Sequence, residues 1–178
     1  VRGGEQDVCV FWTGLLQEMR RLEMESSRAM VWPGLVSVGG DWCTHVDRLF
    51  AHVCEERCRC AGCDAMAVNF TRSSLLSLPV PELPSSRAVT CVTDLYPEYC
   101  RMAPDFSEDD GLLLCEGACG SRQEHWVQRR VASTPNVLLV EVPRFSVRGQ
   151  FRAFALQAEE ELLLPDLEPL ELFGVVHF

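Results

Sequence analysis

Apolar residues recur with helical spacing in the N-terminal third of the chain. The segment Gly14 to Glu25 has arginine and glutamate on one side and four apolar residues on the other: Leu15, Leu16, Met19 and Leu22. A spacing of three to four residues predicts an amphipathic helix, and we expect Ser26-Ser27 to end it. Asp41 to Glu56 has a similar apolar face, which predicts a second helix. That face consists of Trp42, Val46, Leu49, Phe50 and Val53.

The pattern changes after Cys63, where apolar residues alternate with polar ones or form short continuous runs. Such segments, bounded by turn residues, predict strands. The four main ones are Ala67 to Leu78, His125 to Ala132, Val137 to Phe145 and Leu172 to His177. A shorter strand is expected at Phe151 to Leu156, and a short helix at Ala88 to Tyr99 that Pro97 ends. Helices followed by an antiparallel sheet define an α+β fold.

Loops separate these segments. Turn residues predict connections at Met30 to Gly34, Pro79 to Ser86, Ser133 to Asn136 and Ser146 to Gln150. Arg101 to Gly111 is acidic and is expected to be a solvated surface loop.

Ten cysteines are many for 178 residues, and they fall into close groups. Cys60 and Cys63 form a CxxC pair ahead of one predicted strand, and Cys115 and Cys119 form a CxxxC pair ahead of another. Four thiolates in two such pairs predict a tetrahedral structural zinc site. A local set remains an alternative, since it offers two pairs without a distant strand: Cys54, Cys58, Cys60 and Cys63.

Charge and composition narrow the function classes. The formal net charge is −10, and an acidic chain gains nothing from neutralising phosphates, so we expect no nucleic-acid partner. No apolar run approaches the roughly 20 residues that cross a bilayer, and no signal peptide is evident, so no membrane partner is expected. Clustered cysteines without a signal peptide favour a reducing cytoplasm or nucleus. All 16 basic residues are arginine, which is typical of biased codon usage or of selection against ubiquitin acceptor lysines.

The order of motifs resembles that of the ubiquitin-specific proteases. The matching stretches are Cys60 and Cys63, Leu76 to Pro81, Cys115 and Cys119, and Thr134 to Phe145. The C-terminal ELFGVVHF, Glu171 to Phe178, is similar to another family stretch, so the resemblance runs from Leu16 to Phe178. The second cysteine pair is one residue longer than the family pattern.

This resemblance implies one partial domain over residues 1–178 with a papain-like ubiquitin-specific protease fold. Residues 14–56 would form thumb-like helices, and residues 57–178 would form the fingers and palm strands. It also implies structural zinc in the fingers and ubiquitin or ubiquitinated proteins as partners.

Family chemistry requires a cysteine nucleophile, a histidine base and a third group that orients the histidine. Cys9 lies at the start of the first predicted helix and is the candidate nucleophile, although the family's Gly-Asn-Thr before it is absent. His177 precedes the place where the family carries its catalytic histidine. Trp42 and His45 stand where the family has an Asp and a Glu.

Three further histidines have structural or metal-binding interpretations. His45 and His52 share a face of the second predicted helix, where Cys54 and Cys58 could join them as ligands, although both fit a surface or core role better. His125 adjoins Trp126 on a predicted strand and is expected to be structural.

The sequence thus favours a cysteine-type deubiquitinase domain that lacks its catalytic boxes and is inactive by itself. The alternative is a non-catalytic ubiquitin-binding or scaffolding module on the same fold. A zinc-ribbon protein unrelated to ubiquitin is a third class, but it leaves the palm-like strands unexplained.

Overall fold

The structure, a computed structural model, describes residues 8–29, 37–38, 41–42, 44–80, 89–104, 112–143, 155–165 and 167–174. Three helices occur in this part: α1 (Val8–Ala29), α2 (His45–Phe50) and α3 (Val92–Tyr99). The first strands are β1 (Ser37–Val38), β2 (Asp41–Trp42), β3 (His52–Cys60), β4 (Met66–Ser73), β5 (Leu76–Ser77) and β6 (Val89–Cys91). The later strands are β7 (Ala103–Pro104), β8 (Leu112–Leu114), β9 (Arg122–Ser133), β10 (Val140–Glu141), β11 (Ala155–Gln157), β12 (Glu161–Leu162) and β13 (Leu170–Glu171).

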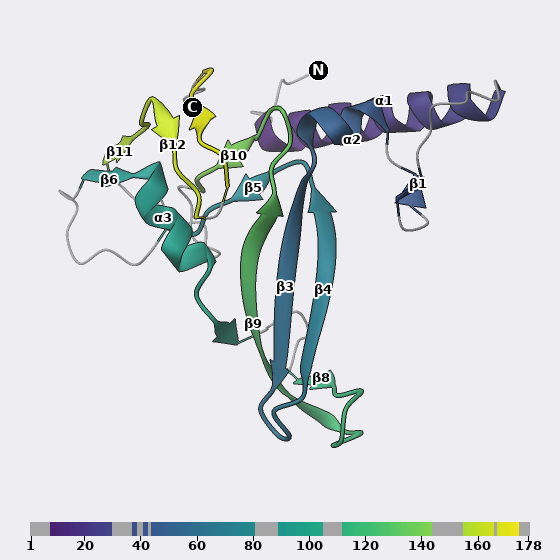
Figure 1. The fold of residues 1–178 in the computed structure, drawn as a ribbon, viewed down its shortest axis with the longest axis vertical. Coiled ribbons are helices and arrows are strands. Elements are labelled where there is room, and N and C mark those ends of the chain that lie inside the picture. Colours follow the sequence, from purple (N-terminus) through teal and green to yellow (C-terminus); the bar gives the residue numbers. More distant parts are fainter. Residues whose placement is uncertain are drawn as a thin grey trace, which may run out of the picture.

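A long antiparallel sheet is the largest element of the fold. Its strand order is β4-β3-β9-β7, and β8 also pairs with β9. The strands β3, β4 and β9 project away from α1, α2, β5 and β10, and their far ends form a narrow tip (Figure 1). The mixed helical and antiparallel architecture agrees with the α+β prediction.

The second predicted helix is wrong over most of its length. Only His45–Phe50 is helical, Asp41–Trp42 is a strand, and His52–Cys60 is the central strand of the long sheet. Thr44 and Asp47 form a capping box that starts the helix, and Ala51 is already extended. Since β3 is hydrogen-bonded along both edges, tertiary pairing overrides the helical spacing of its apolar residues. Residues 52–56 therefore belong to the sheet and not to thumb-like helices.

Helix α1 is longer than predicted. It extends beyond Gly14 to Glu25 at both ends, and Ser26-Ser27 does not end it. The guanidinium of Arg21 lies 2.6 Å from the carboxylates of both Glu18 and Glu25. Such pairs at spacings of three and four residues stabilise a helix, which supports its C-terminal half.

Three strand predictions need correction. Ala67 to Leu78 divides into β4 and β5, which belong to different sheets. Of Val137 to Phe145, only Val140–Glu141 is a strand in the described part, and it pairs in parallel with β5 rather than with β9. Near Leu172 to His177 the described strand is Leu170–Glu171, which pairs with β12.

The strand predicted at His125 to Ala132 is confirmed within β9. The short helix is confirmed as α3, but β6 precedes it, and Pro97 lies inside it without ending it. Tertiary contacts compensate for the missing N–H of Pro97, because Leu95 and Tyr96, the two residues before it, are buried in the core. The predictions for Met30 to Gly34, residues 81–86, residues 105–111, Ser146 to Gln150, residues 151–154 and residues 175–178 lie outside the described residues.

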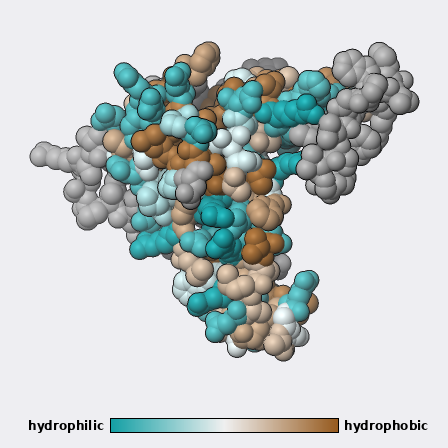
Figure 2. Space-filling model, in the orientation of Figure 1, coloured by the Kyte–Doolittle hydropathy of each residue, from teal (hydrophilic) through white to brown (hydrophobic). Residues whose placement is uncertain are grey.

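The main core lies where α3 meets β5 and one end of β9. Its buried members are Leu76, Leu78, Leu95, Tyr96, Val131 and Leu164. The Tyr96 hydroxyl accepts a hydrogen bond from the Val131 N–H at 2.9 Å, and the rings of Tyr96 and Tyr99 stack 5.8 Å apart. Figure 2 shows apolar surface gathered in the part of the molecule that contains α3 and β10.

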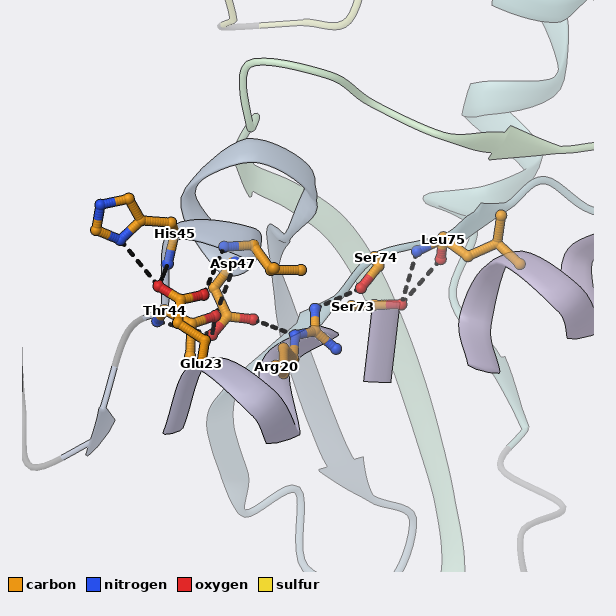
Figure 3. Close-up of polar contacts among 9 residues, drawn as sticks. Arg20, Glu23, Thr44, His45, Asp47, Ser73, Ser74 and Leu75 are labelled. Carbon is orange, nitrogen blue, oxygen red and sulfur yellow. Dashed lines mark hydrogen bonds and ion pairs between the residues drawn. The ribbon is translucent and has the colours of Figure 1, made fainter. Parts of the chain in front are cut away.

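Side chains of α1 hold α2 in place (Figure 3). The Glu23 carboxylate accepts hydrogen bonds from the backbone N–H groups of His45 and Val46, and it lies 2.9 Å from the His45 ring. An anionic group at a helix N-terminus is favourable because the first N–H groups have no partner within the helix. Arg20 reaches from α1 to both Asp47 and the Ser74 hydroxyl, which joins α1, α2 and the β4–β5 junction.

None of the helices in the described part combines the length and apolar composition needed to cross a membrane.

The N-terminus of α3 is capped by a distant carboxylate. Glu159 accepts hydrogen bonds from the N–H groups of Val92 and Thr93 at 3.0 and 3.2 Å. Partial burial raises the pKa of Glu159, but the hydrogen bonds from Thr93 and Val92 outweigh it and leave the pKa below its ordinary value. A depressed carboxyl pKa stabilises the folded state above the unfolded pKa, and that stabilisation is lost as pH falls through the folded pKa.

We expect Glu159→Gln to lower the free energy of unfolding by about 1 kcal/mol at neutral pH. The difference from the unsubstituted chain should shrink as pH drops below about 4.5, the ordinary carboxyl pKa. Urea unfolding at a series of pH values measures this, with Glu160→Gln at the exposed neighbour as control. Equal losses in both variants, or a loss independent of pH, would contradict the capping role.

Candidate metal centre

Each cysteine pair lies in a turn between two antiparallel strands at the tip of the long sheet. Strand β3 ends at Cys60, and the chain returns as β4 after a turn in which Asp64 has a left-handed φ of 55°. Strand β8 leads to Cys115, and β9 begins after Gly120, which has a φ of 58°. In both turns the left-handed residue directly follows the second cysteine of the pair.

The pairing of β3 with β9 brings the two turns together. Cys60 lies opposite His125, and the Ala61 N–H donates to the Glu124 carbonyl at 2.9 Å. Two turns that are far apart in the sequence therefore meet at one end of the sheet (Figure 1).

The four sulfurs form a compact cluster. Sγ of Cys60 lies 3.8 Å from Sγ of Cys119, and Sγ of Cys63 lies 3.7 Å from Sγ of Cys115. All four sulfurs lie within 4.8 Å of one another. A tetrahedral ion with Zn–S bonds of about 2.3 Å requires sulfur–sulfur distances of about 3.8 Å. The donor set therefore fits structural zinc, with four protein ligands and no open coordination position.

The thiols of Cys63 and Cys119 differ in how readily they ionise. The N–H of Ala65 and the thiol of Cys119 lower the pKa of Cys63 to about 6. The interaction with Cys63, together with burial, raises the pKa of Cys119 to about 12. One thiolate is thus favoured at the expense of its neighbours, because like charges at these distances repel. A divalent cation would remove this repulsion and allow four thiolates.

Two glycines allow the turns to approach. A Cβ on Gly117 would lie 2.7 Å from Cβ of Ala65, and a Cβ on Gly62 would lie 3.0 Å from Sγ of Cys119. The Gly117 N–H also donates to Sγ of Cys115 at 3.3 Å. Cysteine spacing alone gives no sign of this role, although one glycine stands inside each cysteine pair. The extra residue of the CxxxC pair is accommodated within the turn before Gly120.

We expect Gly117→Ala to weaken zinc binding by about 10–100-fold, the range typical of changes next to metal ligands. The added methyl group would overlap Ala65 and push the two turns apart. Competition with a chromophoric chelator measures the affinity, and Ala118→Ser at an exposed position of the same turn is the control. An affinity for Gly117→Ala equal to that of the control would show that the close approach is not required.

The other candidate residues lie elsewhere. Among the described residues the metal-ligand cluster excludes Cys54 and Cys58, which lie within β3. Cys54 is buried and its Sγ lies 3.1 Å from the Tyr99 hydroxyl. The alternative local set of four cysteines is therefore not assembled.

The described histidines have structural surroundings. His45 contacts Glu23, and Nδ1 of His125 lies 2.9 Å from the Gln123 carbonyl oxygen. His52 is buried at the start of β3, and burial lowers its pKa. Cys9 lies in the first turn of α1 and is half-buried, while His177 lies outside the described residues.

Comparison with known proteins identifies the fold and not the family. No family model matches the sequence, and no curated protein matches it. Solved structures do match, and the similarity to one of them shows a deubiquitinase-like fold. One is the structure of the SAGA Ubp8/Sgf11/Sus1/Sgf73 DUB module bound to ubiquitin aldehyde. The similarity has a TM-score of 0.57 at 16% identity and covers 88% of this chain and 32% of the matched chain. The present chain thus spans about a third of that neighbour's length.

Proposed function

We propose that this chain is the zinc-stabilised fingers-and-palm part of a ubiquitin-specific protease-type domain, and that it binds ubiquitin. The observation that carries the proposal is the four-cysteine cluster at the tip of the long sheet, within a deubiquitinase-like fold. The similar module was solved bound to ubiquitin aldehyde, which supports ubiquitin as the partner. A thiolate-rich site needs reducing conditions, so the proposal includes a cytoplasmic or nuclear location.

We further propose that this chain alone does not hydrolyse ubiquitin conjugates. A free cysteine has a pKa near 8.5 and is mostly protonated at neutral pH without a neighbouring base. His45 and His125 make the structural contacts described above, and His52 is enclosed at 1% exposure. Ubiquitin binding depends on the surfaces of the long sheet and of the part that contains α3 and β10. It therefore does not require catalytic activity.

One observation favours the alternative, a working cysteine-type deubiquitinase. Cys9 lies in the first turn of α1, where the positive end of the helix dipole favours a thiolate. In that case Cys9 would be the nucleophile.

The experiment uses ubiquitin carrying a C-terminal electrophile together with unmodified ubiquitin. We expect no covalent capture, but saturable binding of unmodified ubiquitin in a calorimetric or NMR titration. Cys115→Ser should lose that binding with the metal, whereas Cys58→Ser should retain it. Capture that Cys9→Ala abolishes would establish the alternative, and absence of both capture and binding would refute both functions.

A further inference from the structure

Strand β4 is exposed on both faces along most of its length, and it carries its large apolar side chains on one of them. Met66, Val68 and Phe70 are exposed at 54%, 51% and 64%. Alternate residues of a strand point to the same face, so these three form one row. The residues between them, Ala67, Asn69 and Thr71, are small or polar. The strand therefore presents its large apolar side chains to water, and a continuous row of this kind marks an interaction site.

The row faces away from the main core. Register partners in antiparallel strands share a face, and Thr71 is aligned with Cys54 and Val131, of which Val131 belongs to the core. Phe70, one residue earlier, is aligned with Glu55 and points to the opposite side of the sheet. The row consequently lies on the sheet face that the core cluster does not cover. Figure 2 shows apolar surface along the β4 side of the sheet.

Strand β4 is also an edge. It pairs with β3, and within the described residues no strand pairs with its other side. Edge strands are commonly protected by proline, bulges or several charges. The eight residues of β4 contain no proline and a single charge, Arg72. An extended segment can therefore add to this edge and place alternate side chains beside the apolar row.

Arginines adjoin the row on the same face. Val68 is aligned with Arg57, and Met66 is aligned with Arg59. Their side chains are 43% and 47% exposed. Two acids contact these arginines: Glu55 is 6% exposed and pairs with Arg57 and Arg130, and Asp64 lies 3.6 Å from Arg59. The three arginines and two acids together carry a charge of +1. The face is thus locally positive on a chain whose formal net charge is −10.

We propose that the β4 strip, defined as Met66, Val68 and Phe70 with Arg57 and Arg59, docks an extended acidic segment of a partner protein. Apolar side chains of that segment pack on the row, and its carboxylates face the arginines. A second copy of this chain is a poorer occupant, because a symmetric contact would place arginine against arginine. The proposal does not rest on ubiquitin binding.

The test uses a labelled eight-residue peptide of alternating glutamate and valine, which matches the length of β4. A peptide of alternating lysine and valine is the control. We expect saturable binding of the acidic peptide, weakening as added salt shortens the Debye length from about 10 Å to about 3 Å. Phe70→Asp and Arg59→Gln should each weaken binding about tenfold or more, as loss of an anchoring contact does. Asn69→Asp makes the same charge change on the other face of β4 and should retain binding.

Zinc content and circular dichroism establish that the variants are folded. If Phe70→Asp does not fold, Val68→Ser replaces it as a milder change in the same row. Equal binding of the two peptides would overturn the proposal, as would equal losses in Phe70→Asp and Asn69→Asp. Displacement of the peptide by unmodified ubiquitin would also overturn it, because the strip would then be a ubiquitin surface. Concentration-dependent dimers that Phe70→Asp abolishes would assign the strip to a second copy instead.

Discussion

Cys115→Ser is expected to abolish zinc binding and to unfold the tip of the long sheet. Apparent binding free energies of structural zinc are about 10–16 kcal/mol in zinc-finger peptides, so the loss of one ligand removes a large share of local stability. The tip has little else to support it, since Met66, Ala67 and Val68 of β4 are all exposed. Treatment with a chelator should produce the same state in the unsubstituted chain.

Metal analysis and amide hydrogen exchange provide the measurement. We expect one zinc per chain, none in Cys115→Ser, and rapid exchange in that variant confined to the tip. Cys58→Ser is the matched control, because Cys58 lies on β3 outside the cluster and should leave the metal in place. Retention of zinc in Cys115→Ser together with its loss in Cys58→Ser would favour ligands nearer in sequence.

Leu95→Ala is expected to lower the free energy of unfolding by about 2–5 kcal/mol, the range for buried leucines. Leu95 is fully buried in α3 and belongs to the core cluster with Leu78 and Val131. Alanine is a good helix former, so the loss reports the cavity and not a change in helix propensity. Urea unfolding followed by circular dichroism measures it.

The matched control is Leu163→Ala, because Leu163 is 55% exposed. It should change the free energy of unfolding by no more than about 0.5 kcal/mol. Zinc content should remain at one per chain in both variants, since distant sites contribute additively. Similar losses in the two variants would mean that the core is not centred on α3.

Local pattern predicted the elements whose own residues carry a clear periodicity or spacing. Neighbouring residues alone reveal the apolar stripe of α1, the alternation of β9 and the spacing of the two cysteine pairs. The prediction of β3 as helix was wrong because its state depends on pairing with two strands distant in sequence. The parallel pairing of β10 with β5 could not be foreseen for the same reason.

The metal site was predictable in composition but not in geometry. Two cysteine pairs identified the donor set, yet the choice between the distant and the local set required the β3–β9 register. The roles of Gly62 and Gly117 follow from contacts between the turns, which no single stretch of sequence contains. The cap of α3 by Glu159 joins residues 67 positions apart and left no local signal.

The alignment of Cys60 with His125 has a consequence for how the sheet reaches its final pairing. A slip of one residue between β3 and β9 would turn the side chains of one strand to the other face. The turn that carries Cys115 and Cys119 would then be displaced relative to Cys60, and four sulfurs could no longer surround one ion. Zinc would bind only the correctly aligned sheet, so metal binding would select the native strand alignment during folding.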